Sequence, residues 1–314
     1  HPHPTPSSSC ITDLATLMSI SASTTMPSQT RRKTPRPQRG TRKARSMQEG
    51  KGWLVGTSGL MVSRDRWLSI PTLNCLEVNS TFYSLLGKKT GENLAGMPER
   101  VSFVFKVSKY ITHLKRLNGV GEAWGKFVES VAPLRSRTAG YLVQLPPSFK
   151  RTDENVARLQ SFAKMVARGG GRGPQMIVEL RDESWLVPAT YALCRKLGWC
   201  VSGTLVQRLP DSKSRKAKSW MGTMPTGVYL PPRTSGMMYF RVHGKPGYRG
   251  YVLEEQLRKI AKQMAATGAP VKAMMFNNVF FDDRGRTCKA TPAAGRYAAV
   301  CDAGLFGKLV GATM

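Results

Sequence analysis

Short runs of β-branched and other apolar residues recur eight times between residues 53 and 276, with longer helical patterns between them. Runs of this length are typical of buried strands, and their alternation with helical segments is typical of βα units around a parallel sheet. Eight such repeats over roughly 260 residues predict an α/β fold, a single (β/α)8 TIM barrel, with an open doubly wound sheet as the alternative. The predicted strands are 53–57, 75–79, 102–107, 140–145, 175–180, 200–205, 237–242 and 271–276.

Helical periodicity is clearest in four of the intervening segments. Pro188 stands where a first-turn proline is tolerated, and Gly198 and Gly268 stand where helix C-caps are expected. The predicted helices are 122–132, 153–167, 188–197 and 254–267.

Residues 1–50 differ from the rest of the chain in composition. They are rich in Ser, Thr, Pro and Arg, and Asp13 is their only acidic residue before Glu49. Such a segment cannot bury enough apolar surface to offset the entropy lost on ordering. We therefore predict a disordered or extended basic N-terminal arm over residues 1–50 and the barrel over residues 51–314.

The arm also bears on localisation. Its poverty in acidic residues fits an organelle transit peptide better than a secretory signal, which predicts a mitochondrial protein. The alternative is another intracellular compartment. No stretch reaches the roughly 20 apolar residues of a transmembrane helix, so a soluble protein is expected.

The charge balance is strongly positive, with 48 Lys and Arg against 19 Asp and Glu, a formal net charge of +29. Residues 1–50 hold eight basic and two acidic residues, a net +6, which leaves +23 on residues 51–314. Self-repulsion of this size opposes compaction, and a polyanion would relieve it. Nucleic acid is the first expectation and an anionic membrane surface the second.

RNA binding is the leading functional interpretation. No recognised RNA-binding module occurs, so recognition would depend on shape and phosphate contacts. We predict a structural or assembly component of a mitochondrial ribonucleoprotein such as the ribosome, with ribosomal RNA and ribonucleoprotein proteins as partners. The predicted nucleic-acid contacts are Arg31, Arg32, Lys33, Arg36, Arg42, Lys43, Arg45, Lys213, Arg215, Lys216 and Lys218.

Polar side chains lie at the ends of seven predicted strands, where TIM barrels place their chemistry. Glutamate, lysine and histidine there are candidates for acid–base catalysis, and the arginines could clamp a phosphate or carboxylate through two hydrogen bonds. In the alternative interpretation, these charged residues satisfy one another in a polar layer of the core. The candidate catalytic residues are Glu77, Lys106, Glu179 and His243, and the candidate ligand-binding or anion-binding residues are Asn79, Gln144, Arg181, Arg241, Asn277 and Asn278.

Neither a metal nor a cofactor is predicted. His113 and His243 are the only histidines after residue 50, too few for a multi-metal hydrolase site. No nucleophile elbow, P-loop or Rossmann fingerprint occurs. The six cysteines show no paired spacing, so we expect free thiols in a reducing compartment rather than a disulfide framework.

Several longer segments occur together in one order between residues 53 and 280. They are GTSG (56–59), LEVNSTFY (76–83), FVFKVSKYITH (103–113), GYLVQLPPSF (140–149), VELRDESW (178–185), YFRVHG (239–244) and FNN (276–278). In this combination the chain resembles the family called domain of unknown function 72, the YecE-like TIM barrels. The resemblance implies a (β/α)8 barrel with a polar pocket at its C-terminal face, and no particular reaction.

The chain also departs from the pattern of that family. Leu60 follows GTSG where the family usually has tryptophan, the sixth strand ends without a carboxylate, and the loop 208–219 is rich in lysine and arginine. These changes favour a barrel that is not an enzyme. The alternative is an enzyme of unknown reaction that acts on a phosphorylated or sugar-like small molecule at the C-terminal mouth of the barrel.

Overall fold

The computed structural model describes residues 52–168, 173–207, 222–245, 248–280, 288–289 and 291–312. The chain divides into two units, His1–Lys43 and Ala44–Met314, and every described residue belongs to the second. The predicted arm and all predicted nucleic-acid contacts lie outside the described residues. Among the described residues, every helix is too short or too polar to span a lipid bilayer.

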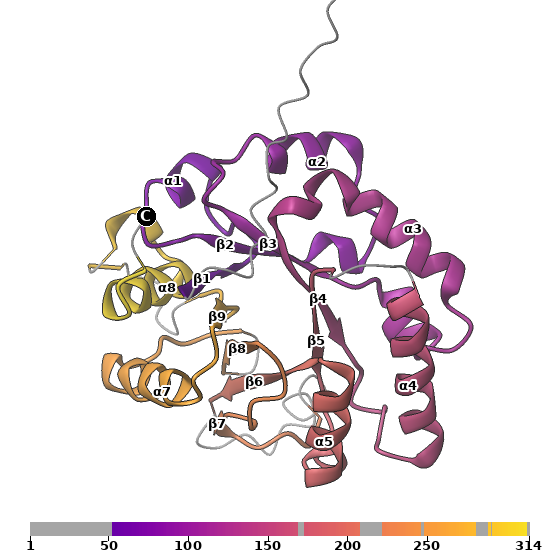
Figure 1. Ribbon diagram of the computed structural model, residues 1–314. Coiled ribbons are helices and arrows are strands. Elements are labelled where there is room, and N and C mark those ends of the chain that lie inside the picture. The colour runs from indigo at the N-terminus through magenta and orange to yellow at the C-terminus, as the bar shows by residue number, and fades with distance from the viewer. Residues whose placement is uncertain are drawn as a thin grey trace, which may run out of the picture. The chain divides into compact units, whose positions relative to one another are not determined.

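One closed sheet forms the centre of the described unit (Figure 1). Its strand order is β5-β4-β3-β2-β1-β9-β8-β6-β7, and β5 also pairs with β6, which closes the barrel. Eight strands are parallel, as predicted, whereas the unpredicted β7 (Gly227–Tyr229) pairs antiparallel with β6. The parallel strands are β1 (Gly52–Ser58), β2 (Cys75–Val78), β3 (Ser102–Lys106), β4 (Thr138–Gln144), β5 (Gln175–Glu179), β6 (Cys200–Val206), β8 (Met237–Gly244) and β9 (Val271–Phe276).

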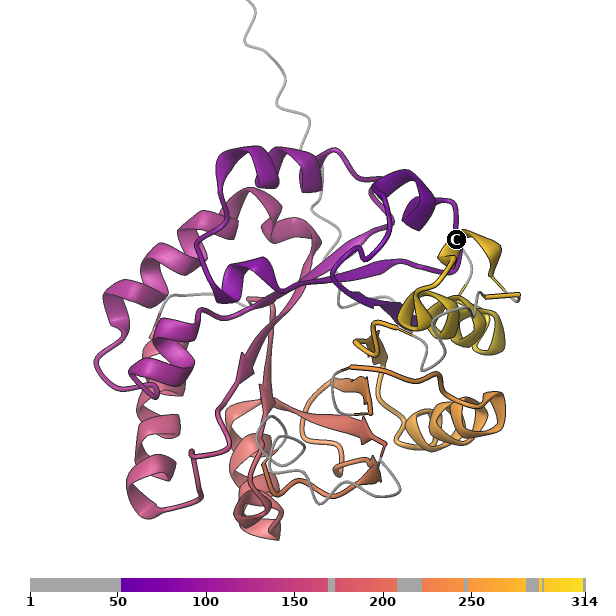
Figure 2. The same cartoon turned by 180° about the vertical axis from the view of Figure 1, so that it is seen from behind.

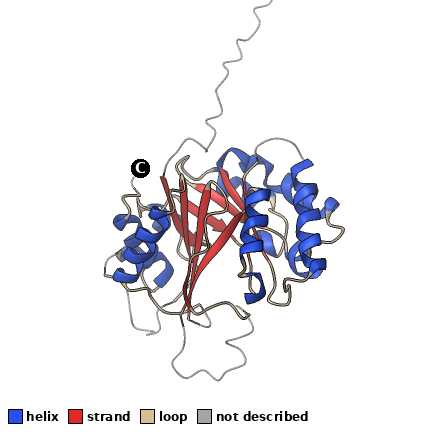
Figure 3. Ribbon diagram, turned by 60° about the horizontal axis from the view of Figure 1, so that its bottom comes forward, coloured by secondary structure: helices blue, strands red, loops and turns tan. Residues whose placement is uncertain are grey.

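Helices surround the strands, as the views along and across the barrel show (Figures 2 and 3). The fold is therefore the predicted TIM barrel, and the four predicted helices are present. Each ends within one residue of its predicted bounds, and Gly198 takes the left-handed conformation expected of a C-cap. The helices are α1 (Arg64–Leu68), α2 (Lys88–Ala95), α3 (Gly121–Val131), α4 (Asp153–Arg168), α5 (Pro188–Leu197), α7 (Glu254–Ala266) and α8 (Ala298–Leu309).

Helix α8 was not predicted because it lacks a polar face. Most of its residues are buried, so its sequence shows no amphipathic period. It packs beside the first and last strands, where the ring of Phe306 meets that of Trp53 edge to face with the centroids 5.3 Å apart. Two glycines of α8 allow close contacts with neighbouring turns and loops, Gly304 with Thr291 and Gly307 with Thr72.

Cys288 and Cys301 form a disulfide, so the prediction of free thiols is wrong for this pair. Cys288 lies next to the first turn of α8, with the two Cα atoms 5.7 Å apart, a proximity that a sequence separation of 13 does not reveal. Cys75, Cys194 and Cys200 are free and buried. Burial raises the pKa of Cys194 and Cys200 to about 12, so both remain protonated thiols.

The packing of α8 can be tested with Gly307→Ala. In an exposed helix this substitution stabilises by about 0.5–1 kcal/mol. Here the new methyl would lie 2.5 Å from the Cβ of Thr72, so we expect the free energy of unfolding to fall by about 1–3 kcal/mol. Gly125→Ala in α3 is the control, since nothing lies within 4 Å of its added methyl. If denaturant unfolding shows a higher free energy of unfolding for both variants than for the wild type, this packing is wrong.

Candidate functional site

Side chains fill the barrel interior in layers, and the period-two geometry of strands explains their order. The lower layer is apolar and includes Cys75, Leu142 and Ile177. Two residues further along the same strands, the side chains again point inward but are polar, close to the C-terminal ends of the strands. This upper layer comprises Glu77, Lys106, Gln144, Glu179, Arg241 and Asn277, and His243 lies two residues beyond Arg241 on β8.

Arg241 on β8 joins two glutamates from other strands. Its Nε and Nη2 donate to the two carboxylate oxygens of Glu77 on β2, at 2.9 and 2.6 Å. Its Nη1 donates to Oε2 of Glu179 on β5 at 2.6 Å. Tyr239, one layer below, donates from its hydroxyl to Glu77 Oε2 at 2.6 Å. All four side chains are essentially inaccessible to solvent, so one guanidinium neutralises charges from strands three apart in the sheet.

Arg181, just after β5, completes the pairing. Its Nε donates to Glu179 Oε1 at 2.8 Å, and its Nη2 donates to Oε1 of Gln144 at 2.9 Å. Arg181 and Gln144 are both buried. The predicted ligand-binding residues Gln144, Arg181 and Arg241 are therefore brought together, in contact with the predicted catalytic glutamates.

The two glutamates are ionised. Burial by itself raises the pKa of Glu77, but the charge and hydrogen bonds of Arg241, with the Tyr239 hydroxyl, outweigh it and hold the pKa below its usual value. Burial also raises the pKa of Glu179 by itself, but the positive charges of Arg241 and Arg181 outweigh it and hold this pKa well below its usual value. A glycosidase pair needs one carboxyl that holds a proton, and neither glutamate meets that requirement.

His243 lies at the end of β8 and is fully buried. Its Nε2 is 3.6 Å from Glu179 Oε2, and its Nδ1 is 3.4 Å from the amide nitrogen of Asn277. Burial lowers the pKa of His243 to about 4, with help from the positive charges of Arg241 and Arg181 and against the attraction of Glu179. The imidazole is thus neutral at pH 7, and the acid–base role predicted for His243 from the sequence stays a prediction.

Lys106 differs from the other charged members of the layer. Its side chain is half-buried at the end of β3, and its ammonium lies over the ring of Phe82, 3.9 Å from the centroid. Within the described residues it makes no ion pair and no hydrogen bond through Nζ. Burial lowers the pKa of Lys106 to about 7, and the charges of Arg241 and Arg181 add to this shift.

His113 belongs to the same cluster, although it was predicted only as a member of an insufficient metal set. It lies in a π-helical turn, Tyr110–Leu114, and its ring meets Phe82 edge to face with the centroids 5.0 Å apart. Burial lowers the pKa of His113 to about 4, and the positive charge of Lys106 is the next largest cause of this shift. Thr112 Oγ1 is 2.9 Å from its Nδ1. Its position next to Lys106 carried no signal in the sequence.

The predicted asparagines have different surroundings. Asn278 points away from the charged layer, since its amide nitrogen donates to the Gly250 carbonyl at 2.8 Å and to Asp302 of α8 at 2.7 Å. Asn79 follows β2, and its Oδ1 is buried with no hydrogen-bond partner in the described part of the chain. Asn79 therefore has an unsatisfied buried acceptor just after the C-terminal end of β2.

The described ranges hold no cluster of three or more His, Cys, Asp or Glu side chains arranged for a metal ion. The expectation of no metal and no cofactor stays a prediction. Tyr239 was not singled out from the sequence, although its position two residues before Arg241 places it on the same face of β8.

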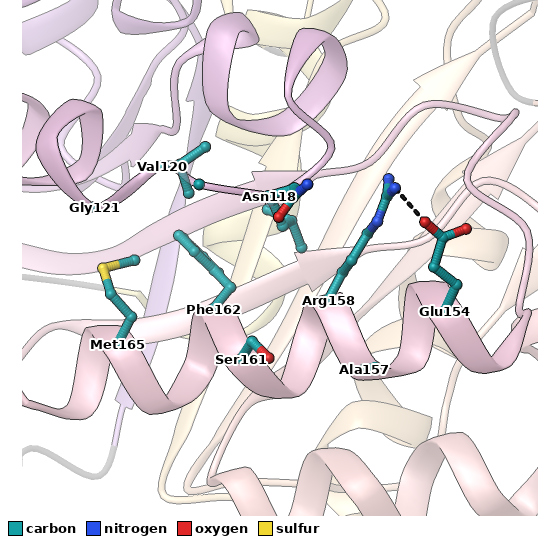
Figure 4. A pocket seen from close by; sticks show the side chains of 11 residues that line it. Asn118, Val120, Gly121, Glu154, Ala157, Arg158, Ser161, Phe162 and Met165 are labelled. Atoms are coloured by element: carbon teal, nitrogen blue, oxygen red, sulfur yellow. Dashed lines mark hydrogen bonds and ion pairs between the residues drawn. The ribbon is translucent and has the colours of Figure 1, made fainter.

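A separate pocket of about 430 Å³ lies on the outer side of the barrel (Figure 4). The loop that includes Asn118 and Val120 forms one wall, and Phe162 and Met165 of α4 face it. The ion pair of Arg158 with Glu154 lies at one end. No residue of the charged layer lines this pocket, so it is not part of the candidate site.

The closed parallel barrel with a charged layer at the C-terminal ends of its strands defines a TIM-barrel protein, the class that carries its chemistry at that face. The sequence profile of the family described as protein of unknown function DUF72 matches residues 65–295. The chain belongs to this family, as the resemblance predicted.

Solved structures of the same family have the same fold. A DUF72 family protein from Enterococcus faecalis V583, at 2.52 Å resolution, aligns with a TM-score of 0.62 and 20% identity, over 82% of this chain and 97% of that chain. A DUF72 family protein from Thermotoga maritima MSB8 aligns with a TM-score of 0.61 and 22% identity, over 82% and 99%. No curated protein sequence matches the chain significantly.

Arg241→Met tests the dependence of the layer on one guanidinium. It leaves two buried carboxylates without their main partner, so we expect the free energy of unfolding at neutral pH to fall by about 3–5 kcal/mol. Arg258→Met is the control, because its exposed pair with Glu254 on α7 contributes no more than about 0.5 kcal/mol.

The pH dependence of the stability lost in Arg241→Met gives a second test of the pairing. In the wild type, the lowered pKa values of Glu77 and Glu179 give a contribution that is present above the unfolded value of about 4.3 and lost as pH falls through the folded values. Without Arg241 these buried carboxyls take up protons at higher pH. As pH falls from 7 to 5, the free energy of unfolding of Arg241→Met, measured with denaturant, should therefore approach that of the wild type. A difference between the two free energies that stays constant would contradict the pairing.

Proposed function

We propose that the C-terminal mouth of the barrel binds a small anionic molecule, phosphorylated or sugar-like, and that the protein is an enzyme acting on it. The observation that carries the proposal is Lys106, a half-buried cation at the mouth with no carboxylate partner among the described residues. Buried charges are ordinarily paired, so a ligand is the natural source of the missing negative charge.

The charges of the layer support an anionic ligand. Glu77 and Glu179 are balanced by Arg241 and Arg181, which leaves Lys106 as a surplus positive charge. The glutamates already accept short hydrogen bonds from the two arginines, so neither is available to neutralise the lysine. An anion at the mouth would meet this uncompensated charge in a partly desolvated setting, where electrostatic attraction is stronger than in water.

Aromatic side chains around Phe82, the ring that Lys106 contacts, support a sugar-like ligand. Tyr83 is 80% exposed and meets Phe82 edge to face, with the ring centroids 5.1 Å apart. Tyr110 is 46% exposed and begins the turn that holds His113 against Phe82. Exposed aromatic faces next to a polar cluster offer the combination of apolar surface and convergent polar groups typical of small-molecule sites.

RNA binding, the leading interpretation of the sequence, stays a prediction. Neither the fold nor the structural relatives support it, and the basic segments 31–45 and 213–218 lie outside the described residues. The described observations favour the small-molecule alternative.

Binding of phosphorylated sugars, sugar acids and glycerol 3-phosphate can be screened by thermal shift and then measured by calorimetry. We expect affinity for these anions to be highest below pH 7 and to fall by up to about tenfold per pH unit above it, because Lys106 loses its charge near pH 7. His113 and His243, with pKa values of about 4, do not titrate between pH 6 and 8.

Two variants of Lys106 and one control test whether the charge at this position binds the anion and causes the pH dependence. Lys106→Met should abolish binding, whereas Lys106→Arg should bind with no pH dependence over this range because guanidinium stays charged. Lys164→Met, an exposed site on α4, should bind as the wild type does. If none of these anions binds the wild type, or if Lys106→Met binds as well as the wild type, the proposal is wrong.

A further inference from the structure

We infer that Lys106 is the nucleophile of this site and forms an imine with the carbonyl carbon of an aldehyde or ketone that carries a phosphate or carboxylate group. The inference rests on the proposed function, because the carbonyl compound must enter the same mouth. It goes further by naming the substrate class and the bond that forms.

The position of the amine is the first argument. A lysine acts as a nucleophile when its nitrogen is neutral, reachable and free of a carboxylate partner. Lys106 lies at the C-terminal end of β3, partly exposed, and its nitrogen rests on the face of Phe82 at 3.9 Å from the ring centroid. In contrast, Lys126 on α3 pairs with Glu122 at 2.6 Å and has its pKa raised by that contact.

The charges around Lys106 are the second argument. Arg241 from β8 and Arg181 from the end of β5 act on Lys106 as cations, and Glu77 and Glu179 act on it as anions. Arg241 already pairs with both glutamates, and Arg181 pairs with Glu179. Burial and the two arginines together bring the pKa of Lys106 to about 7, so roughly half of the amine is neutral at pH 7. An ordinary lysine, with a pKa of about 10.4, has less than about one part in a thousand in that form.

The reaction balances without an oxidant or a reductant. The lone pair of Nζ attacks the carbonyl carbon, the C–N bond forms, and the π electrons of the carbonyl move to its oxygen. The proton lost by nitrogen passes to that oxygen, directly or through solvent at the partly open mouth, and gives a carbinolamine. Uptake of one more proton releases water and leaves a protonated imine. Its positive charge stays over the Phe82 ring, where a cation is favoured.

Reductive trapping tests the inference. The full chain is incubated at pH 7 with D-glyceraldehyde 3-phosphate and sodium cyanoborohydride, which reduces protonated imines, and the labelled lysines are mapped by peptide mass spectrometry. Pyruvate is the second probe. We expect Lys106 to be labelled at least tenfold faster than exposed lysines such as Lys109 and Lys164, and excess glycerol 3-phosphate, which has no carbonyl, to slow that labelling selectively.

The variants separate this inference from the proposed function. Lys106→Arg should still bind glycerol 3-phosphate but show no fast reductive labelling at residue 106. In Lys164→Met, Lys106 should be labelled as fast as in the wild type. If glycerol 3-phosphate binds and yet both probes label Lys106 no faster than exposed lysines, the imine is wrong while the proposed function stands. If the phosphorylated and sugar-acid ligands all fail to bind and Lys106 shows no preference, both are wrong.

Discussion

The bridge from Arg241 to Glu77 and Glu179 is the interaction on which the upper half of the barrel depends. Three strands distant in sequence each contribute one charge to the interior, and burial makes an unpaired charge there very costly. The planar guanidinium meets one carboxylate with two hydrogen bonds and reaches the second with its remaining edge. Such a bridge fixes the relative positions of β2, β5 and β8 more than it adds net stability, since desolvation offsets much of the attraction.

That fixed layer explains why Lys106 is different. The carboxylates held by arginine cannot turn toward the lysine without leaving a guanidinium unpaired, so they act on Lys106 only from a distance. The arginines meanwhile oppose its charge directly. The balanced charges of the layer thus leave one amine of low pKa, which lies over the ring of Phe82. The arginines and glutamates thus hold the structure of the layer, whereas Lys106 provides the reactive amine.

The sequence predicts the barrel well because its determinants are local. Apolar runs mark all eight parallel strands, and Gly198 marks a helix end. The candidate site is predicted in membership but not in pairing. Period-two alternation places Glu77, Glu179 and Arg241 inside, whereas closure and stagger of the barrel decide that Arg241 reaches both glutamates and that Asn278 turns to Asp302. The Cys288–Cys301 disulfide likewise depends on a return of the chain that no local pattern records.

The positive charge of residues 51–314 agrees with a small-molecule site as readily as with RNA. Residues of one sign spread over a protein raise the local concentration of any anion, and a cleft focuses that potential toward its mouth. Phosphorylated metabolites benefit from this field as polynucleotides do. What distinguishes the two is the surface that the partner contacts. A polynucleotide would use exposed lysines and arginines over a broad face, whereas Lys106 is a half-buried side chain whose amine lies over the ring of Phe82. A half-buried cation of low pKa suits a small ligand better than a polynucleotide.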